Sequence, residues 1–198
     1  MNATTLNLSF AFYLAALMAY AAAYLFSRPW LRKAGMAALA AAWLLQTAFL
    51  ALRWQAAGHA PLSNQFESLV SMDWGITGLC FCFWRLAPGN WLGPTTAGLS
   101  LALLGVCALL DSSISPLVPA LQSNWLLLHV SVIMLAYAAL ALSFLASAAY
   151  LTVYAGRSSH QTAVTLDLFN ERAMGLGYLL LAAALVLGAV WANEAWGT

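Results

Sequence analysis

Apolar residues dominate the chain in long runs that polar clusters interrupt. A transmembrane helix needs about 20 mostly apolar residues. The pattern predicts six such helices, and the fourth is expected to be short and the fifth long. Their expected ranges are 8–26, 34–52, 66–84, 95–110, 125–152 and 174–192. The sequence therefore predicts an all-α, polytopic membrane helix bundle, with residues 1–198 forming a single transmembrane domain.

Composition and charge agree with this class of protein. Hydrophobic residues make up 64% of the chain and charged residues 7%, whereas soluble domains are about 25% charged. Seven basic residues are balanced by six acidic ones, which gives no case for a nucleic-acid partner, since nucleic-acid binding depends on an excess of clustered basic charge. Such a chain is expected in a lipid bilayer. Cys80, Cys82 and Cys107 all fall in apolar runs and are expected to be small buried hydrophobes.

Basic residues between the helices predict the orientation. Six of the seven fall in segments that share one side if the N-terminus is outside, and Arg53 alone falls on the other side. The positive-inside rule therefore predicts an outside N-terminus. The six are Arg28, Arg32, Lys33, Arg85, Arg157 and Arg172. The outside then receives 53–65, 111–124 and the final WANEAWGT, while the inside segment 156–172 is expected to contain an interfacial helix.

His129 is the histidine most suggestive of chemistry. It lies about one turn into the fifth helix, with Trp125 four residues earlier on the same face. An ionisable residue within a membrane helix is a functional candidate, and a neutral imidazole next to a tryptophan suits haem as an axial ligand. The equal alternative is an interhelical hydrogen bond. His160 lies in a polar loop and is expected to be solvated.

The first outer loop supplies further candidates. Asn64 and Glu67 have the spacing of a capping box for the third helix, and this structural role is favoured. His59 either bonds within the loop or reaches a ligand, and the loop role is favoured. Arg53 could meet a carboxylate such as a haem propionate. Asp73, two turns below Glu67, is expected to carry a proton or to bond to Tyr or Ser on a neighbouring helix.

Several stretches resemble one known family. WANEAWG resembles the opening of the tryptophan-rich WWD motif of cytochrome c assembly proteins. Two further stretches, GHAPLSNQFESL and NWLLLHVSVIMLAYAAL, and the run from Leu166 to Gly197 resemble CcsA-type proteins of the system II cytochrome c synthase. System I haem-delivery proteins share the WWD motif, but the GHAPLSN and NWLLLHV stretches favour system II.

The resemblance implies a function and a set of residues. It implies a bacterial plasma-membrane protein that works with a CcsB-type subunit. The pair presents haem b at the periplasmic face, where it is joined by thioether bonds to the CXXCH motif of apocytochrome c. His129 matches one axial ligand of the haem iron. The start of the haem cradle is matched by Trp191, Ala192, Asn193, Trp196 and Gly197, and Trp125, His59, Arg53 and Glu67 are expected to support the pocket.

The chain also departs from the family pattern. The rest of the WWD motif, a second external histidine and another membrane histidine do not occur in these 198 residues. We therefore expect an N-terminal portion of a larger protein, or one piece of a split one. Such a subunit of a haem lyase is not expected to be active alone. Two other functions stay open: a transporter of haem or a small solute, and a structural membrane subunit that binds no ligand.

Overall fold

Six helices make up the described part of this computed structural model, which covers residues 2–87, 91–114, 116–117, 122–155 and 160–197. The all-α prediction is confirmed. The bounds are α1 Asn2–Phe26, α2 Pro29–Ala57, α3 Gln65–Phe83, α4 Leu92–Cys107, α5 Asn124–Ala155 and α6 His160–Trp196. Four of them, α1, α2, α5 and α6, are long and apolar enough to cross a membrane. As expected, α4 is short and α5 is long, with 16 and 32 residues.

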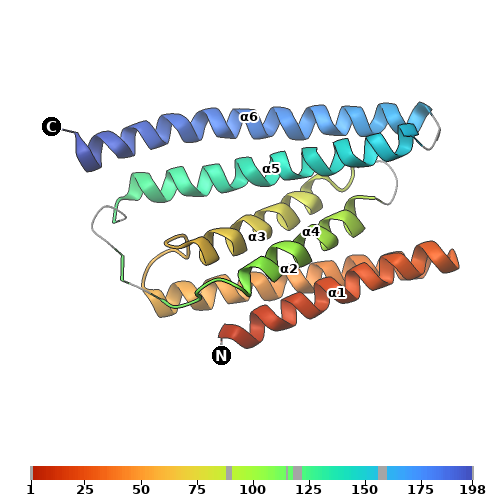
Figure 1. The fold of residues 1–198 in the computed structure, drawn as a ribbon, viewed down its shortest axis with the longest axis horizontal. Coiled ribbons are helices and arrows are strands. Elements are labelled where there is room, and N and C mark those ends of the chain that lie inside the picture. The colour runs from red at the N-terminus through yellow and green to blue at the C-terminus, as the bar shows by residue number, and fades with distance from the viewer. Residues whose placement is uncertain (1, 88–90, 115, 118–121, 156–159, 198) are drawn as a thin grey trace.

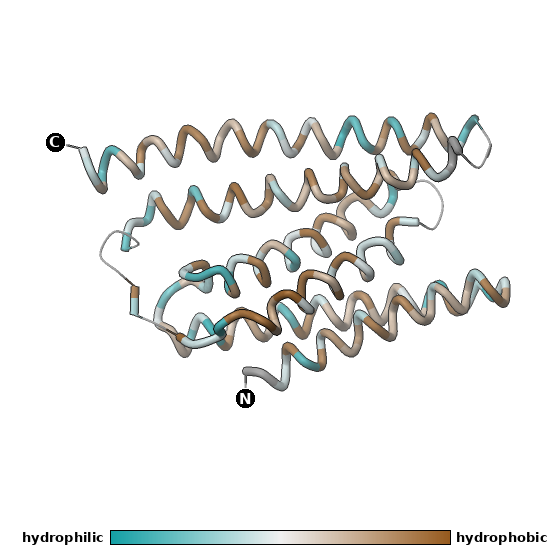
Figure 2. Tube along the Cα trace, in the orientation of Figure 1, coloured by the Kyte–Doolittle hydropathy of each residue, from teal (hydrophilic) through white to brown (hydrophobic). Residues whose placement is uncertain are grey.

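The helices form successive layers (Figure 1). The antiparallel pair of α1 and α2 lies on one side, α3 and α4 lie in the middle, and α5 and α6 form an antiparallel hairpin on the other side. α5 packs against α3, whereas α6 packs mainly along α5. Brown apolar segments run through every helix in Figure 2, as expected of a bundle surrounded by lipid.

Helix α6 corrects one prediction. The segment containing Asp167, Glu171 and Arg172 is helical, but it is continuous with the sixth span and does not form a separate interfacial helix. Neither glycine nor proline interrupts 160–174, so nothing in the sequence breaks the helix there. Phe169 also holds this part of α6 in place, because its ring packs edge-on against Trp91 and Phe83 at centroid distances of 5.1 and 5.6 Å.

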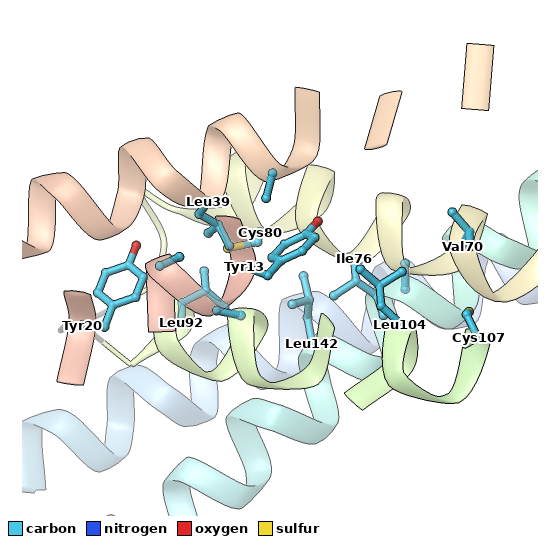
Figure 3. Packing of buried hydrophobic residues seen from close by; sticks show 14 of the residues in the cluster. Tyr13, Tyr20, Leu39, Val70, Ile76, Cys80, Leu92, Leu104, Cys107 and Leu142 are labelled. Carbon is cyan, nitrogen blue, oxygen red and sulfur yellow. The ribbon is translucent and has the colours of Figure 1, made fainter. Parts of the chain in front are cut away.

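One apolar core has members on all six helices. Tyr13 lies in the middle of the cluster, between Leu39 and Ile76 (Figure 3), and all three side chains are fully buried. Cys80 and Cys107 belong to this core as expected, but Cys82 is exposed because it lies on another face of α3.

A buried polar network crosses the same core. The Tyr13 hydroxyl donates to Gln46 Oε1 at 2.7 Å and lies 3.0 Å from Thr77 Oγ1. Gln46 Nε2 donates to Asp73 Oδ2 and to the Val70 carbonyl, both at 3.0 Å. Asp73 therefore bonds to a glutamine, which was not predicted, and Ser100 of α4 is a further side-chain partner of the residue type that was predicted. One amide thus connects α1, α2 and α3 where water cannot compensate a lost bond.

Replacing Gln46 by alanine should destabilise the bundle by about 2–4 kcal/mol, because it leaves polar atoms of Tyr13 and Asp73 buried without this partner. The exposed Gln55, on the same helix, is the matched control. Thermal unfolding in detergent, followed by circular dichroism, should show a clear fall in Tm for Gln46→Ala and almost none for Gln55→Ala. Equal Tm values for the two variants would contradict a structural role for the network.

Candidate functional site at the Trp196 end

The alternating helices bring the candidate segments to one end of the bundle. The loop 58–64, the segment 108–114, the start of α5 and the end of α6 all lie there (Figure 1), and we call this the Trp196 end. Basic residues 28, 32, 33, 85 and 172 lie toward the opposite end, while Arg157 is outside the described residues. The grouping of segments that the sequence predicts therefore agrees with the helix order.

His129 projects from α5 onto α6. Its Nδ1 lies 2.7 Å from the carbonyl oxygen of Ala184. Because a carbonyl can only accept, Nδ1 must carry the hydrogen and donate it. In a neutral imidazole the other nitrogen, Nε2, then keeps its lone pair. No described residue hydrogen-bonds to Nε2, and the side chain is only partly buried. This is the arrangement in which a backbone carbonyl orients a histidine that ligates a metal.

Small residues on α6 make room for the ring. A Cβ at Gly188 would lie 2.8 Å from Cε1 and 2.9 Å from Nδ1 of His129. A Cβ at Gly177 would meet Leu140 of α5 at 2.7 Å. The two helices thus approach closely where glycines face the partner, as in membrane helix pairs generally. Gly188 was not a candidate from sequence, although it lies one helical turn after the residue whose carbonyl binds His129.

Two tryptophans pack against each other at the C-terminal end of α6. The rings of Trp191 and Trp196 meet edge to face, with centroids 4.8 Å apart and planes at 65°. Trp196 is 66% exposed, so a flat apolar surface remains open beside the pair. The Gly197 N–H donates to the Asn193 carbonyl at 2.8 Å, and a Cβ at Gly197 would overlap that carbonyl oxygen. Ala192 directly follows Trp191 in the last turns of the helix.

The ends of α5 and α6 are also joined directly. Ser123 Oγ donates to Glu194 Oε2 at 2.6 Å. The same hydroxyl accepts the N–H of Trp125 at 3.2 Å, in the manner of an N-cap. Trp125 is 41% exposed and lies four residues before His129. The structure therefore brings His129, Trp125 and the Trp191–Trp196 pair to one end of the α5–α6 hairpin.

Arg53 and Glu67 are engaged with each other instead. Arg53 Nε donates to Glu67 Oε1 at 2.6 Å, and both side chains are almost completely buried. The other guanidinium nitrogens, Nη1 and Nη2, donate to the carbonyls of Ser112 and Ser113 at 2.9 and 3.0 Å. These contacts tie α2 and α3 to the segment after α4. A guanidinium held by three partners leaves little capacity for an external carboxylate.

The predicted capping box is present, but the donor to the Glu67 carboxylate differs from the expected one. Asn64 Oδ1 accepts the Glu67 N–H at 2.9 Å, as predicted. The Glu67 carboxylate, however, accepts from the N–H and the hydroxyl of Ser63, at 2.8 and 2.7 Å, in place of the Asn64 N–H. The neighbouring turn is ordered by Asp111, whose pKa lies below its usual value because the Ser113 N–H and hydroxyl both donate to its carboxylate.

His59 lies in the loop after α2, where Gly58 adopts φ 73° and turns the chain. Its Nδ1 lies 3.1 Å from the carbonyl of the next residue, Ala60, which is the bond within the loop that the sequence favours. Nε2 is buried, without a partner among the described residues. The histidine borders a cavity of about 300 Å³ that also touches Ser123 and Asn124. His59 is therefore next to the start of α5, on a loop separate from the His129 contact with α6.

These features define a multi-pass membrane protein with an oriented imidazole and paired tryptophans at one end. Residues 5–198 match the family described as cytochrome C assembly protein, and the chain belongs to that family. It is similar to proteins named cytochrome c biogenesis protein CcsA. The Synechocystis protein is 33% identical, with 97% of this chain and 77% of that protein covered. The Synechococcus elongatus protein is 34% identical, with coverage of 83% and 67%.

Membership establishes a role in cytochrome c biogenesis. Such a role implies haem and apocytochrome c as substrates, and it agrees with the several membrane-spanning helices. The roles of His129 and of the tryptophans in handling haem are predictions.

Gly188→Ala should destabilise the α5–α6 hairpin by about 1–3 kcal/mol, because the added methyl displaces the His129 ring and breaks its bond to Ala184. Gly175→Ala is the matched control on the same helix, where an added Cβ meets nothing within 4 Å. Without a clash, alanine in a helix should be neutral or more stable by about 1 kcal/mol. Thermal unfolding of both variants measures the difference. A Gly188→Ala protein as stable as the control would contradict the close approach.

Proposed function

We propose that this protein presents haem at the Trp196 end for covalent attachment to apocytochrome c. The observation that carries the proposal is the His129 contact with Ala184, because it fixes the tautomer in which Nε2 has a free lone pair. An imidazole held in this way can ligate haem iron without first breaking a hydrogen bond. The Trp191–Trp196 pair and Trp125 supply apolar surface beside it for the macrocycle.

Thioether formation needs no catalytic nucleophile from this chain. Each thiol of a CXXCH motif adds across a haem vinyl group, so the nucleophile comes from the substrate. The protein contributes position, and holding two reactants in a fixed orientation accelerates their reaction by removing translational freedom. His129 fixes the iron, and with it the distance of the vinyl groups from the approaching peptide. In this account the Trp196 end faces the periplasm of a bacterial plasma membrane, and a CcsB-type subunit completes the assembly.

The two other functions explain the structure less well. A purely structural subunit accounts for the interhelical bond of His129 but gives no role to the open Nε2. A solute transporter would line a wet path with its polar side chains. Instead, Tyr13, Gln46 and Asp73 bond to one another inside the core. Among the described residues, His59 lies on a separate loop and His160 begins α6 at the far end, so neither is proposed as a second axial ligand.

The first test is haem binding by the purified chain. His129→Ala should weaken haem affinity at least tenfold, about 1.4 kcal/mol, seen as a loss of Soret intensity in a titration. Added imidazole should restore part of that intensity by replacing the missing ligand. His160→Ala, the control at the other end of α6, should bind haem as the unchanged protein does. A His129→Ala protein with normal affinity and normal Soret position would show that the imidazole only joins two helices.

A further inference from the structure

Glu194 is an unusual residue for its position. It lies in the last turn of α6, where the negative end of the helix dipole disfavours a carboxylate. The side chain is exposed, so burial does not stabilise Glu194 at this position. The acceptor role toward Ser123 at 2.6 Å is the interaction that offsets this local cost. Glu194 therefore belongs to the contact between two helices rather than to the stability of its own helix.

The partner is the amino-terminal end of α5. The Ser123 hydroxyl accepts the Trp125 N–H and donates to Glu194, while its carbonyl accepts the Leu127 N–H at 3.2 Å. One residue thus begins the helix that carries His129 and also binds the end of α6. The carboxylate lies next to the positive end of the α5 dipole, which favours negative charge. Donors in series polarise one another and strengthen the chain of bonds.

The contact determines where the tryptophan pair lies relative to His129. Among the described residues, two hydrogen bonds hold the hairpin on this side of its midpoint, one from His129 to Ala184 and one from Ser123 to Glu194. Trp191 and Trp196 flank Glu194 on α6. The Ala184 bond lies ten residues before Glu194 on α6, so the Ser123 contact acts much closer to the tryptophan pair. Helix ends fray when few contacts hold them.

We propose that Glu194 is a positioning residue, which through Ser123 holds the Trp191–Trp196 pair beside His129 for haem. The inference rests on the proposed function for its purpose, but the contact itself can be tested without haem. Glu194→Ala removes only this link, Ser123→Ala removes the link and the helix cap, and Glu194→Gln keeps an oxygen that accepts from Ser123. Glu171→Ala is the control, an exposed acidic residue on the same helix away from the Trp196 end.

Hydrogen exchange of the haem-free protein gives the first measurement. Amides of 191–197 should exchange at least several-fold faster in Glu194→Ala than in the unchanged protein, and Glu171→Ala and Glu194→Gln should remain protected. Haem titration gives the second. Glu194→Ala should weaken haem affinity about tenfold, and the double variant with Ser123→Ala should be no weaker than Ser123→Ala alone, because the link is already lost.

Unchanged exchange in Glu194→Ala, or losses that add in the double variant, would overturn the proposal. Normal haem affinity in Glu194→Ala would overturn it as well. Failure of the His129 proposal is separate, since it would show as normal haem binding by His129→Ala while the exchange of 191–197 still depended on Glu194.

Discussion

The close approach of α5 and α6 is the constraint on which the candidate site depends. An imidazole can donate to a carbonyl of the neighbouring helix only if the two backbones come near, and the backbones come near because α6 presents glycine to α5. A carbonyl inside a helix already accepts from its own helix, but its second lone pair remains available. His129 uses that capacity at Ala184. Because the carbonyl accepts a hydrogen bond from Nδ1–H, the packing of two helices determines that Nε2 is the nitrogen with the free lone pair.

The rest of the bundle gives the hairpin a fixed support. α5 rests on α3, and α3 is joined to its neighbours by buried polar contacts at two levels. In the core, Gln46 bonds to Asp73 and Tyr13. Toward the Trp196 end, Arg53 pairs with Glu67 and with the segment after α4. Removing one member of such a buried pair leaves a charge uncompensated, so these contacts hold the helices in one arrangement. Arg53 and Glu67 thus hold the segment after α4 against α2 and α3.

Much of the fold follows from the sequence. Long apolar runs predict six helices, because each run must bury its backbone polar groups within a helix in lipid. The capping role of Asn64 was also predictable, since a side-chain acceptor three residues before Glu67 satisfies a free N–H. The continuity of α6 was not predicted, because charged residues at 167–172 suggest a boundary although nothing there breaks a helix.

The site was predictable only in part. His129 and the tryptophans were candidates because such residues are unusual in membrane helices. The partners of His129 could not be predicted. The Ala184 carbonyl and the space beside Gly188 depend on how α5 and α6 are aligned, and the pattern of apolar residues does not determine that alignment. Gln46 as the partner of Asp73 was missed for the same reason. The Ser123–Glu194 contact joins residues 71 apart in sequence, and the only local sign of it was an acidic residue at a helix end that disfavours one.

The most direct test of the account is nuclear magnetic resonance of the chain carrying ¹⁵N-labelled histidine, before and after haem is added. The three histidines can be assigned by single substitutions. For His129 we expect a protonated Nδ1 and an unprotonated Nε2 in the haem-free protein, and a large shift or loss of the Nε2 signal when haem binds. A proton on Nε2 in the free protein, or a His129 signal that haem leaves unchanged, would contradict it.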